Sequence, residues 1–269
     1  MSFRVEPDPS FKDALATAEN ALAGIWVCSG SPLVAEICAG AGFDWIFIDA
    51  EHSPNDLQSI LAQLQAVRGY PVIPVVRPPV NDTVIIKQYL DLGVQSLIIP
   101  MVNTAAEAQA AVAACHYPPA GVRGVGSALA RSARWNRIPD YLQRASQTLS
   151  IMVQIESAQA VENVEQIVAT EGVDGIFIGP SDLAASMGVI GQQSHPEVVA
   201  GVMTAIKAAL AAGKYVGVNA FDEATAQQYI QAGVHYVGVG ADVALLARSS
   251  EALAAKFTGR SASNSPASY

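Results

Sequence analysis

Short apolar runs rich in Val, Ile and Phe alternate along the chain with longer segments in which apolar residues recur at helical spacing. Several of the apolar runs show no polar alternation, which is typical of strands that are covered on both faces. Alternating strands and helices predict a parallel sheet wrapped in helices. Eight strands are expected, at residues 24–28, 45–49, 72–77, 95–100, 150–156, 174–179, 215–218 and 235–240.

The segments between these strands predict amphipathic helices, including those at residues 55–67, 105–115, 161–169, 196–212 and 223–232. Three helices lead into the next strand through a glycine (Gly42, Gly93 and Gly233), which suits a left-handed C-cap. Eight such units favour a single (β/α)₈ barrel, a fold of about 250 residues. We therefore expect an α/β chain with one barrel domain at residues 1–258. The Ser- and Ala-rich tail at 259–269 is expected to be disordered.

Composition narrows the class of protein. The chain has 269 residues, 51% of them hydrophobic and 14% charged, which is enough apolar material for one large core. Its net charge of −9 and the absence of Lys/Arg clusters argue against a nucleic-acid partner. Neither a signal peptide nor a membrane-spanning run is expected. Cys28, Cys38 and Cys115 lack metal-ligand spacing and predict buried, reduced thiols, so we expect a cytoplasmic location.

One connection is too long for a plain strand-to-helix unit. Residues 117–144, between the fourth and fifth predicted strands, are rich in Gly and Arg, and long connections of this kind are often functional. Four arginines lie in it: Arg123, Arg131, Arg134 and Arg137. Each could meet an anionic substrate, contact a neighbouring subunit or lie on solvated surface, and the sequence leaves these alternatives open.

Polar side chains gather where the predicted strands end. In a (β/α)₈ barrel the carboxyl ends of the strands form one rim, which carries the active site. Because the polar residues come from separated parts of the sequence, they predict one active site on that rim. The residues are Asp49, Glu51, His52, Arg77, Gln154, Glu156, Asp182, Asn219 and Asp242.

Glu156 and Asp182 are candidate metal ligands on adjacent strand ends. Two hard oxygen ligands suit Mg²⁺ or Mn²⁺ with substrate and water at the other positions, whereas the alternative is an ion pair with a lysine or arginine. Such a metal can chelate a 2-oxo acid and stabilise the enolate that forms on C–C cleavage. The Gly179-Pro180-Ser181 turn offers the backbone N–H groups of Ser181 and Asp182 to the substrate carboxylate.

Arg77 and His52 are the candidate catalytic side chains. Arg77 ends an apolar strand, so its guanidinium needs an anion. A developing enolate oxygen fits, and a structural pair with Asp49 or Glu51 is the alternative. His52 is the best candidate general base for a substrate hydroxyl, with a structural histidine as the alternative. Asp91 could orient His52 if the end of its helix reaches the same rim.

Three other chemistries lack their residues. No lysine lies inside a predicted strand, which disfavours a Schiff-base aldolase. Neither a phosphate-binding loop nor a dinucleotide fingerprint follows the first strand. Metal-assisted cleavage of a 2-oxo acid is the remaining interpretation.

Six motifs carry a resemblance to a known family. They are FDWIFIDAEHSPND (43–56), VVRPP (75–79), KQYLDLGVQSLIIPMV (87–102), PPAGVRGVGSALARSARW (118–135), VQIES (153–157) and GVDGIFIGPSDLAASMG (172–188). From residue 11 to 257 the chain resembles the metal-dependent, class II pyruvate aldolases of the HpcH/HpaI family. The resemblance implies a barrel of the phosphoenolpyruvate/pyruvate type and reversible cleavage of 4-hydroxy-2-oxoheptanedioate into pyruvate and succinate semialdehyde, in aromatic-compound catabolism. It also implies Mg²⁺, Mn²⁺ or Co²⁺ as cofactor. The assembly implied is a homohexamer, a trimer of dimers with C-terminal helices packed across subunits.

The resemblance also implies roles for single residues. The metal ligands are Glu156 and Asp182. The catalytic group is His52, Asp91, Arg77 and Asp49. The substrate contacts are Gln154, Gly179, Pro180, Ser181, Trp26 and Asn219, of which Trp26 lines the aldehyde pocket. Two positions depart from the family pattern: Ala50 stands where many members have Gly, and Asn219 stands where close relatives have an apolar residue near the substrate.

Three other functions compete with this interpretation. A 2-keto-3-deoxy sugar-acid aldolase, of the 2-dehydro-3-deoxyglucarate or -rhamnonate type, would share the same chemistry, although the GVGSALARSARW stretch favours the heptanedioate enzyme. A non-catalytic barrel would have no need for the acid, histidine and arginine set on one rim. A lyase of the citrate-lyase or malyl-CoA type would need an extended CoA-binding surface, for which the chain is short.

Overall fold

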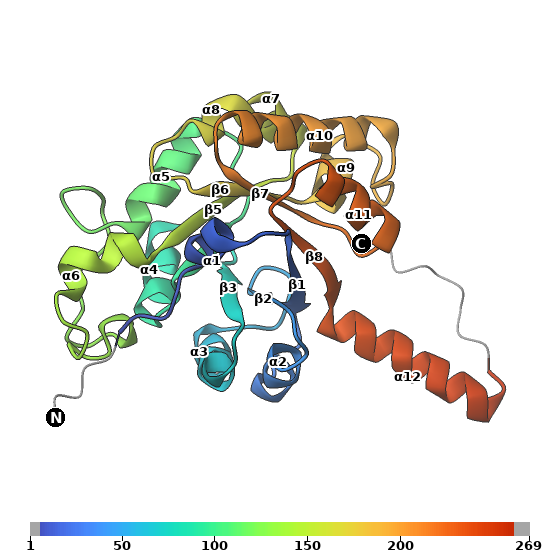
Figure 1. Cartoon of the computed structure of the whole chain (residues 1–269), viewed down its shortest axis with the longest axis horizontal. Helices are drawn as coiled ribbons and strands as arrows, with labels where there is room; N and C mark the ends of the chain where they lie inside the picture. Colours follow the sequence, from blue (N-terminus) through green and yellow to red (C-terminus); the bar gives the residue numbers. More distant parts are fainter. Residues whose placement is uncertain (1–5, 261–269) are drawn as a thin grey trace.

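The barrel is closed, and its eight strands follow one another around it in sequence order. A computed structural model describes residues 6–260. Every strand pairs in parallel with its neighbours, and β1 pairs with β8 to close the sheet (Figure 1). All eight predicted strands are confirmed, with ends that differ by at most two residues. They are β1 (Leu22–Val27), β2 (Trp45–Asp49), β3 (Ile73–Arg77), β4 (Ser96–Ile99), β5 (Ser150–Ile155), β6 (Gly175–Ile178), β7 (Tyr215–Asn219) and β8 (Tyr236–Ala241).

Helices surround the barrel, as predicted, with one difference. The helix expected at residues 161–169 is two short helices, because the chain leaves helical geometry at Asn163, whose side chain donates to the Asn103 carbonyl (2.8 Å). Gly42, Gly93 and Gly233 have positive φ, as their C-cap positions require. The helices are α1 (Phe11–Thr17), α2 (Pro32–Ala39), α3 (Leu57–Ala66), α4 (Thr83–Asp91), α5 (Ala105–Cys115), α6 (Tyr141–Arg144), α7 (Ala158–Glu162), α8 (Val164–Val168), α9 (Pro180–Ser186), α10 (Pro196–Ala211), α11 (Glu223–Gln231) and α12 (Asp242–Thr258).

The amino end of the barrel is closed by aromatic side chains. Phe11 of α1 packs against Trp45 and Tyr236, with ring centroids 5.3 and 5.0 Å apart. A Cβ at Gly24 would lie 2.2 Å from the Trp45 ring, so only glycine leaves room for that indole. A larger apolar layer fills the space between the strands and the helices. Because aromatic side chains fill the interior of the barrel at its amino end, the interior is open to a substrate at the carboxyl end.

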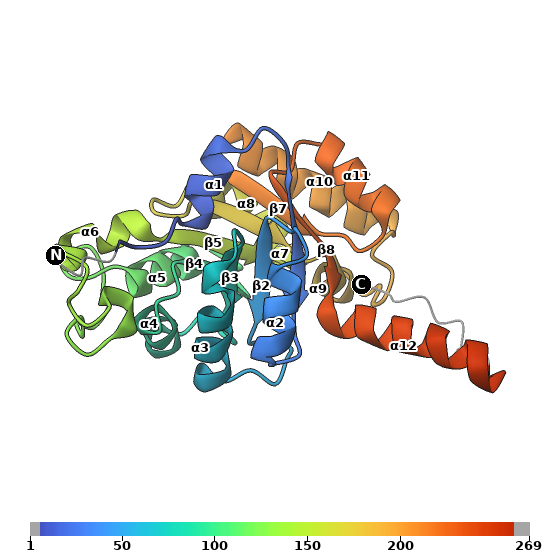
Figure 2. The ribbon, with the colours of Figure 1, turned by 60° about the horizontal axis from the view of Figure 1, so that its bottom comes forward.

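Helix α12 projects away from the barrel (Figures 1 and 2). Its first residue, Asp242, is buried, whereas Leu246, Leu253 and Phe257 are mostly exposed. Within residues 6–260, no helix is long and apolar enough to cross a membrane. The predicted tail falls largely on residues 261–269, outside the described residues, and its first residue, Gly259, caps α12 in the left-handed conformation.

Candidate active site

A cavity of about 140 Å³ lies at the carboxyl ends of the strands. Side chains from β1, β2, β3, β5, β6 and β7 reach it, as expected for parallel strands whose ends meet at one rim. Ten of the twelve residues to which the family resemblance gave a role line this cavity, whereas Glu51 and Asp242, also predicted at the rim, do not. The ten are Trp26, Asp49, His52, Arg77, Gln154, Gly179, Pro180, Ser181, Asp182 and Asn219.

Arg77 is the cation of the cavity and is only 2% exposed. It lies in register with Asp49 on the neighbouring strand, and its Nε donates to Asp49 Oδ1 (2.8 Å). Its Nη1 lies 2.8 Å from Glu51 Oε2 and 3.4 Å from Gln154 Oε1. Burial by itself would lower the pKa of Arg77, but the two carboxylates outweigh it and raise that pKa. Arg77 therefore both forms the structural pair with Asp49 and Glu51 and lies beside the cavity.

Asp49 shapes the turn that presents His52. The backbone N–H groups of Glu51 and His52 donate to the two Asp49 carboxylate oxygens at 3.0 and 3.2 Å. The His52 side chain is 56% exposed at the mouth of the cavity, and its Nε2 lies 3.8 Å from Glu51 Oε2. The acid beside His52 within the chain is therefore Glu51.

Asp91 does not reach this rim. Helix α4 starts after the carboxyl end of β3 and runs back toward the amino end of β4, so its last residue, Asp91, lies at the opposite end of the barrel. There the Asp91 carboxylate accepts from Arg123 Nη2 (3.1 Å). The proposed pairing of His52 with Asp91 is not formed within this chain.

Glu156, the other residue with a role in the resemblance that lies outside the cavity lining, is directly behind it. It is 3% exposed, accepts the Met101 N–H at 2.7 Å, and hydrogen-bonds the Gln154 amide. The pKa of Glu156 is raised to about 7, chiefly by burial and in part by the neighbouring carboxylates of Glu51 and Asp182, against the opposing effects of the Met101 N–H and Arg77.

The surroundings of Glu156 and Asp182 suit a divalent cation. Glu156 is buried and Asp182 is exposed, and the negative charges of Asp182 and Glu51 repel that of Glu156; a bound cation relieves this repulsion. A Cβ at Gly179 would lie 3.2 Å from Glu156 Cβ and 3.4 Å from its Oε2, so the glycine keeps the space beside this carboxylate open. Among residues 6–260, no three His, Cys, Asp or Glu side chains are grouped to hold a metal. The protein can thus offer two carboxylates, Glu156 and Asp182, and leave the other coordination positions to substrate and water.

Trp26 and Asn219 form the other wall. The indole Nε1 of Trp26 donates to Asn219 Oδ1 (2.8 Å), and the same ring lies 4.7 Å from the Arg77 guanidinium carbon. Asn219 therefore holds the ring that stacks on Arg77. The sequence interpretation missed four further lining residues: Cys28, Phe177, Phe221 and Val243. Three of these are apolar, and no charge pattern marks an apolar wall.

The four arginines of the long connection lie away from the cavity. Arg123 is fully buried, with its guanidinium over the Tyr117 ring at 4.6 Å. Arg137 lies over Trp135 at 5.4 Å. Arg131 and Arg134 border a different cavity, at the amino end of the barrel. None of the four lines the rim cavity, so none meets a substrate bound there within this chain.

Comparison with known proteins gives the family. Residues 22–249 match the model of the family described as HpcH/HpaI aldolase/citrate lyase. A protein of Deinococcus radiodurans named hydroxypyruvate/pyruvate aldolase is 53% identical over 252 residues, covering 94% of this chain and 91% of the relative. One of Shigella sonnei named 4-hydroxy-2-oxo-heptane-1,7-dioate aldolase is 52% identical over 260 residues, 97% of this chain and 99% of its own. The crystal structure of a family protein from Burkholderia cenocepacia J2315 superposes with a TM-score of 0.87 at 39% identity, covering 91% of this chain and 97% of that one. The chain belongs to the HpcH/HpaI aldolase/citrate lyase family.

Proposed function

We propose that this protein is a class II aldolase that reversibly cleaves 4-hydroxy-2-oxoheptanedioate into pyruvate and succinate semialdehyde, in the breakdown of aromatic compounds. One observation carries the proposal: a buried guanidinium, an exposed imidazole and two carboxylates suited to a cation surround a single rim cavity. Relatives just over half identical along nearly the whole chain bear aldolase names, including that of the heptanedioate enzyme.

Glu156 and Asp182 would hold a divalent cation such as Mg²⁺, Mn²⁺ or Co²⁺. When bound, this ion supplies Lewis-acid stabilisation of the negative charge that forms on a 2-oxo acid as its C–C bond breaks. Gln154, which hydrogen-bonds Glu156 and lies 3.4 Å from Arg77, is placed to contact the pyruvate half together with the Gly179–Ser181 turn.

His52 and Arg77 would divide the remaining chemistry. His52 takes the proton from the C4 hydroxyl, the C3–C4 bond breaks, and the electron pair passes into the pyruvate enolate as the aldehyde forms. Arg77 stabilises the developing enolate oxygen, because its guanidinium is already fixed by Asp49 and Glu51 and needs no reorganisation. Trp26 and Asn219 would line the aldehyde side.

An adjoining cavity favours a second candidate substrate. This space of about 470 Å³ shares Pro180, Asn219 and Phe221 with the rim cavity. Among the described residues that line it, Asp222 is the one charged side chain, and the polar ones are amides and hydroxyls such as Gln193 and Thr225. Such a lining suits a hydroxylated, uncharged aldehyde better than a carboxylate. Among the 2-keto-3-deoxy sugar-acid aldolases, the rhamnonate type releases such an aldehyde, lactaldehyde, so it is the favoured alternative.

A substrate panel with metal control tests both candidates. Pyruvate release is measured from 4-hydroxy-2-oxoheptanedioate and from 2-dehydro-3-deoxyrhamnonate, with EDTA and then with Mg²⁺, Mn²⁺ or Co²⁺ added back. We expect activity to disappear in EDTA and to return with metal, and the heptanedioate to have the higher kcat/KM. A higher kcat/KM for the sugar acid would select the alternative. Full activity in EDTA, or inactivation by borohydride in the presence of pyruvate, would point to a Schiff base and overturn the mechanism.

We also propose that the protein forms a homohexamer, a trimer of dimers, through α12. Leu246, Leu253 and Phe257 are 67%, 58% and 84% exposed on a helix that projects from its own barrel (Figure 2). Apolar side chains in such a row are typical of an interface. Light scattering on the intact chain should give a hexamer, and Leu253→Asp with Phe257→Asp should give smaller species. A monomeric wild-type protein would contradict the proposal. The cytoplasmic location rests on the sequence and stays a prediction.

A further inference from the structure

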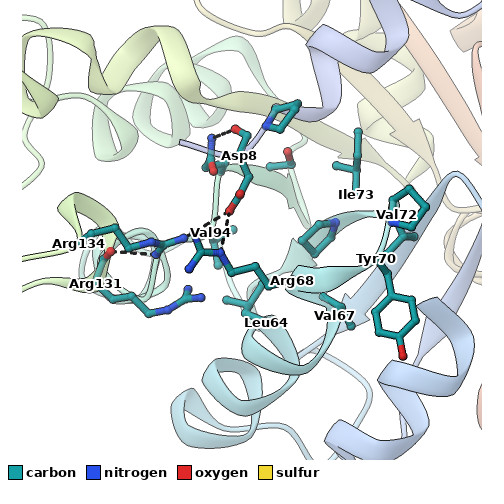
Figure 3. Close-up of a pocket in the computed structure, with 16 residues that line it drawn as sticks. Asp8, Leu64, Val67, Arg68, Tyr70, Val72, Ile73, Val94, Arg131 and Arg134 are labelled. Carbon is teal, nitrogen blue, oxygen red and sulfur yellow. Dashed lines mark hydrogen bonds and ion pairs between the residues drawn. The ribbon is translucent and has the colours of Figure 1, made fainter. Parts of the chain in front are cut away.

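A second cavity, of about 420 Å³, lies at the amino end of the barrel, opposite the rim (Figure 3). Its floor is formed where the connection after α3 enters β3 and the connection after α4 enters β4. Three arginines border it: Arg68 from the end of the α3 segment, and Arg131 and Arg134 from the long connection between β4 and β5. The proposed aldolase reaction uses none of them.

Asp8 is the one carboxylate among the lining residues of this cavity, beside three guanidinium groups. Asp8 Oδ2 lies 3.3 Å from Arg134 Nη2 and 3.9 Å from Arg68 Nε, and Figure 3 shows both groups converging on it. Arg131 has only a backbone partner in the cavity, the Leu92 carbonyl at 2.6 Å. Among the residues that line this cavity, two positive charges therefore lack a counter-charge.

The guanidinium groups are packed closely together above Gly93. A Cβ at that position would lie 3.0 Å from Arg131 Nη1 and 3.1 Å from Arg134 Nη1, so the two groups share the space that the glycine leaves. Arg134 has a side chain only 9% exposed, and its Nε is buried with no hydrogen-bond partner in the described chain. An unpaired buried donor on a charged group is energetically unfavourable, and an acceptor in the cavity would offset that cost.

Electrostatics points the same way. The pKa of Arg131 is lowered to about 10, chiefly by burial and in part by the nearby positive charges of Arg134 and Arg68, with Asp8 opposing. The cations thus repel one another in a partly desolvated space. The rest of the lining is mainly apolar, including Leu64, Val67, Val72 and Val94. The space is larger than a bare inorganic anion needs, and its apolar wall suits a carbon skeleton.

We propose that this cavity is a second, non-catalytic binding site for a small organic dianion, a phosphate monoester or a dicarboxylate. The guanidinium groups of Arg68, Arg131 and Arg134 bind the charged groups, since planar N–H pairs match both carboxylate and phosphate oxygens. The carbon skeleton lies against the apolar wall. The Asp8 carboxylate lies beside Arg134 and Arg68 and therefore competes with the ligand for these two guanidinium groups.

The test is calorimetric titration of the full-length protein with inorganic phosphate, succinate and acetate. Mg²⁺ and saturating pyruvate are present so that the rim cavity is occupied. We expect saturable binding of phosphate, succinate or both at millimolar concentrations, with acetate at least about tenfold weaker because it carries one charge. Which of phosphate and succinate binds more tightly assigns the ligand class. No saturable binding of either dianion up to about 10 mM would overturn the proposal.

Four variants test the position of the site. Arg68→Gln removes a partly exposed cation from the cavity and should weaken binding about tenfold. Asp8→Asn removes the competing carboxylate and should tighten binding about threefold or more. The matched controls are Arg144→Gln and Glu6→Gln, which remove the same charges from a neighbouring exposed pair (3.3 Å) outside the cavity lining. Each control should bind within about twofold of wild type.

The two controls carry the same charge changes as the two cavity variants, so a general effect of net charge would appear in the controls as well. If Arg68→Gln binds as tightly as Arg144→Gln, or Asp8→Asn no more tightly than Glu6→Gln, the site is elsewhere and the proposal is wrong. All four residues are at least 42% exposed, so the variants should fold, and thermal unfolding of each checks this directly. The outcome does not depend on aldolase activity and leaves the proposed reaction untouched.

Discussion

Replacing His52 with alanine should separate proton removal from enolate stabilisation. The His52 side chain is 56% exposed and has one ion-pair partner, Glu51 at 3.8 Å, so its loss should change the free energy of unfolding by no more than about 0.5 kcal/mol. If His52 removes the C4 hydroxyl proton, aldol cleavage should slow by about 10²–10⁴-fold, or about 3–5 kcal/mol in the barrier. Oxaloacetate decarboxylation gives the same pyruvate enolate without a hydroxyl proton, so it should slow by less than about tenfold.

Arg77 is the contrasting position, because it stabilises the enolate that the two reactions share. Arg77→Ala should slow both reactions by about 10²-fold or more, by analogy with the loss of an oxyanion donor. It should also destabilise the fold by about 3–5 kcal/mol, because Asp49 and Glu51, 1% and 14% exposed, lose the cation that compensates them. Arg77→Lys keeps the charge without the planar fork, so it should restore stability more than activity.

The assay measures kcat/KM for both reactions in the wild type and in the three variants, with the metal concentration fixed. Thermal unfolding alongside separates loss of fold from loss of chemistry. The expected pattern is a large difference between the two reactions for His52→Ala and parallel losses for the Arg77 variants. Equal losses in both reactions for His52→Ala would refute these separate roles. They would mean that His52 acts on the enolate or binds water held by the cation.

Three further predictions concern the walls of the site. Asn219→Leu removes the acceptor of Trp26 Nε1 and should change the ratio of kcat/KM values between acceptor aldehydes by a factor equivalent to about 1–3 kcal/mol. Equal losses for every aldehyde would mean that Asn219 stabilises the fold instead. Cys28 should resist iodoacetamide at pH 8, because burial, with Asp49 and Asp242, raises its pKa to about 12 and keeps it a thiol. The rate of alkylation is measured by mass spectrometry, and a rate equal to that of a free peptide cysteine would contradict this prediction. Gly179→Ala places a Cβ 3.1 Å from Gln154 Nε2 and 3.2 Å from Glu156 Cβ, and should weaken Mn²⁺ binding in a direct titration by about tenfold while the fold persists; unchanged affinity would remove Glu156 from the metal site.

The strands and the residues at their ends could be predicted because their positions follow from simple rules. A buried parallel strand is a continuous apolar run, and its carboxyl end must lie on the rim. Arg77 follows four buried or half-buried residues of β3, and the structure places it in register with Asp49, as the alignment of adjacent strands requires. The apolar lining could not be predicted in the same way, because Phe177 reads as one more core residue in an apolar strand.

The long connection between β4 and β5 could not be predicted, because no periodic pattern fixes its path. Its chain includes consecutive left-handed residues, Arg134, Trp135 and Asn136, which no local preference would have suggested. As a result its arginines diverge, with Arg123 turned into the protein toward Asp91 and Arg134 turned toward Asp8. A sequence shows that such residues are charged, whereas only the folded path shows which anion each one meets.

Asp91 is a different case, because the topology that located the other site residues also decides its place. In a (β/α)₈ barrel every helix after a strand begins near the rim and ends near the amino edge of the next strand. Asp91 is the last residue of α4, so the same rule that brings Asp49 and Arg77 to the rim carries Asp91 to the far end of the barrel. The family resemblance implies a role for Asp91 in the reaction, whereas within one chain the Asp91 carboxylate pairs with Arg123. Topology alone therefore assigns a residue at the carboxyl end of a strand to the rim, and one at the end of the following helix to the opposite end of the barrel.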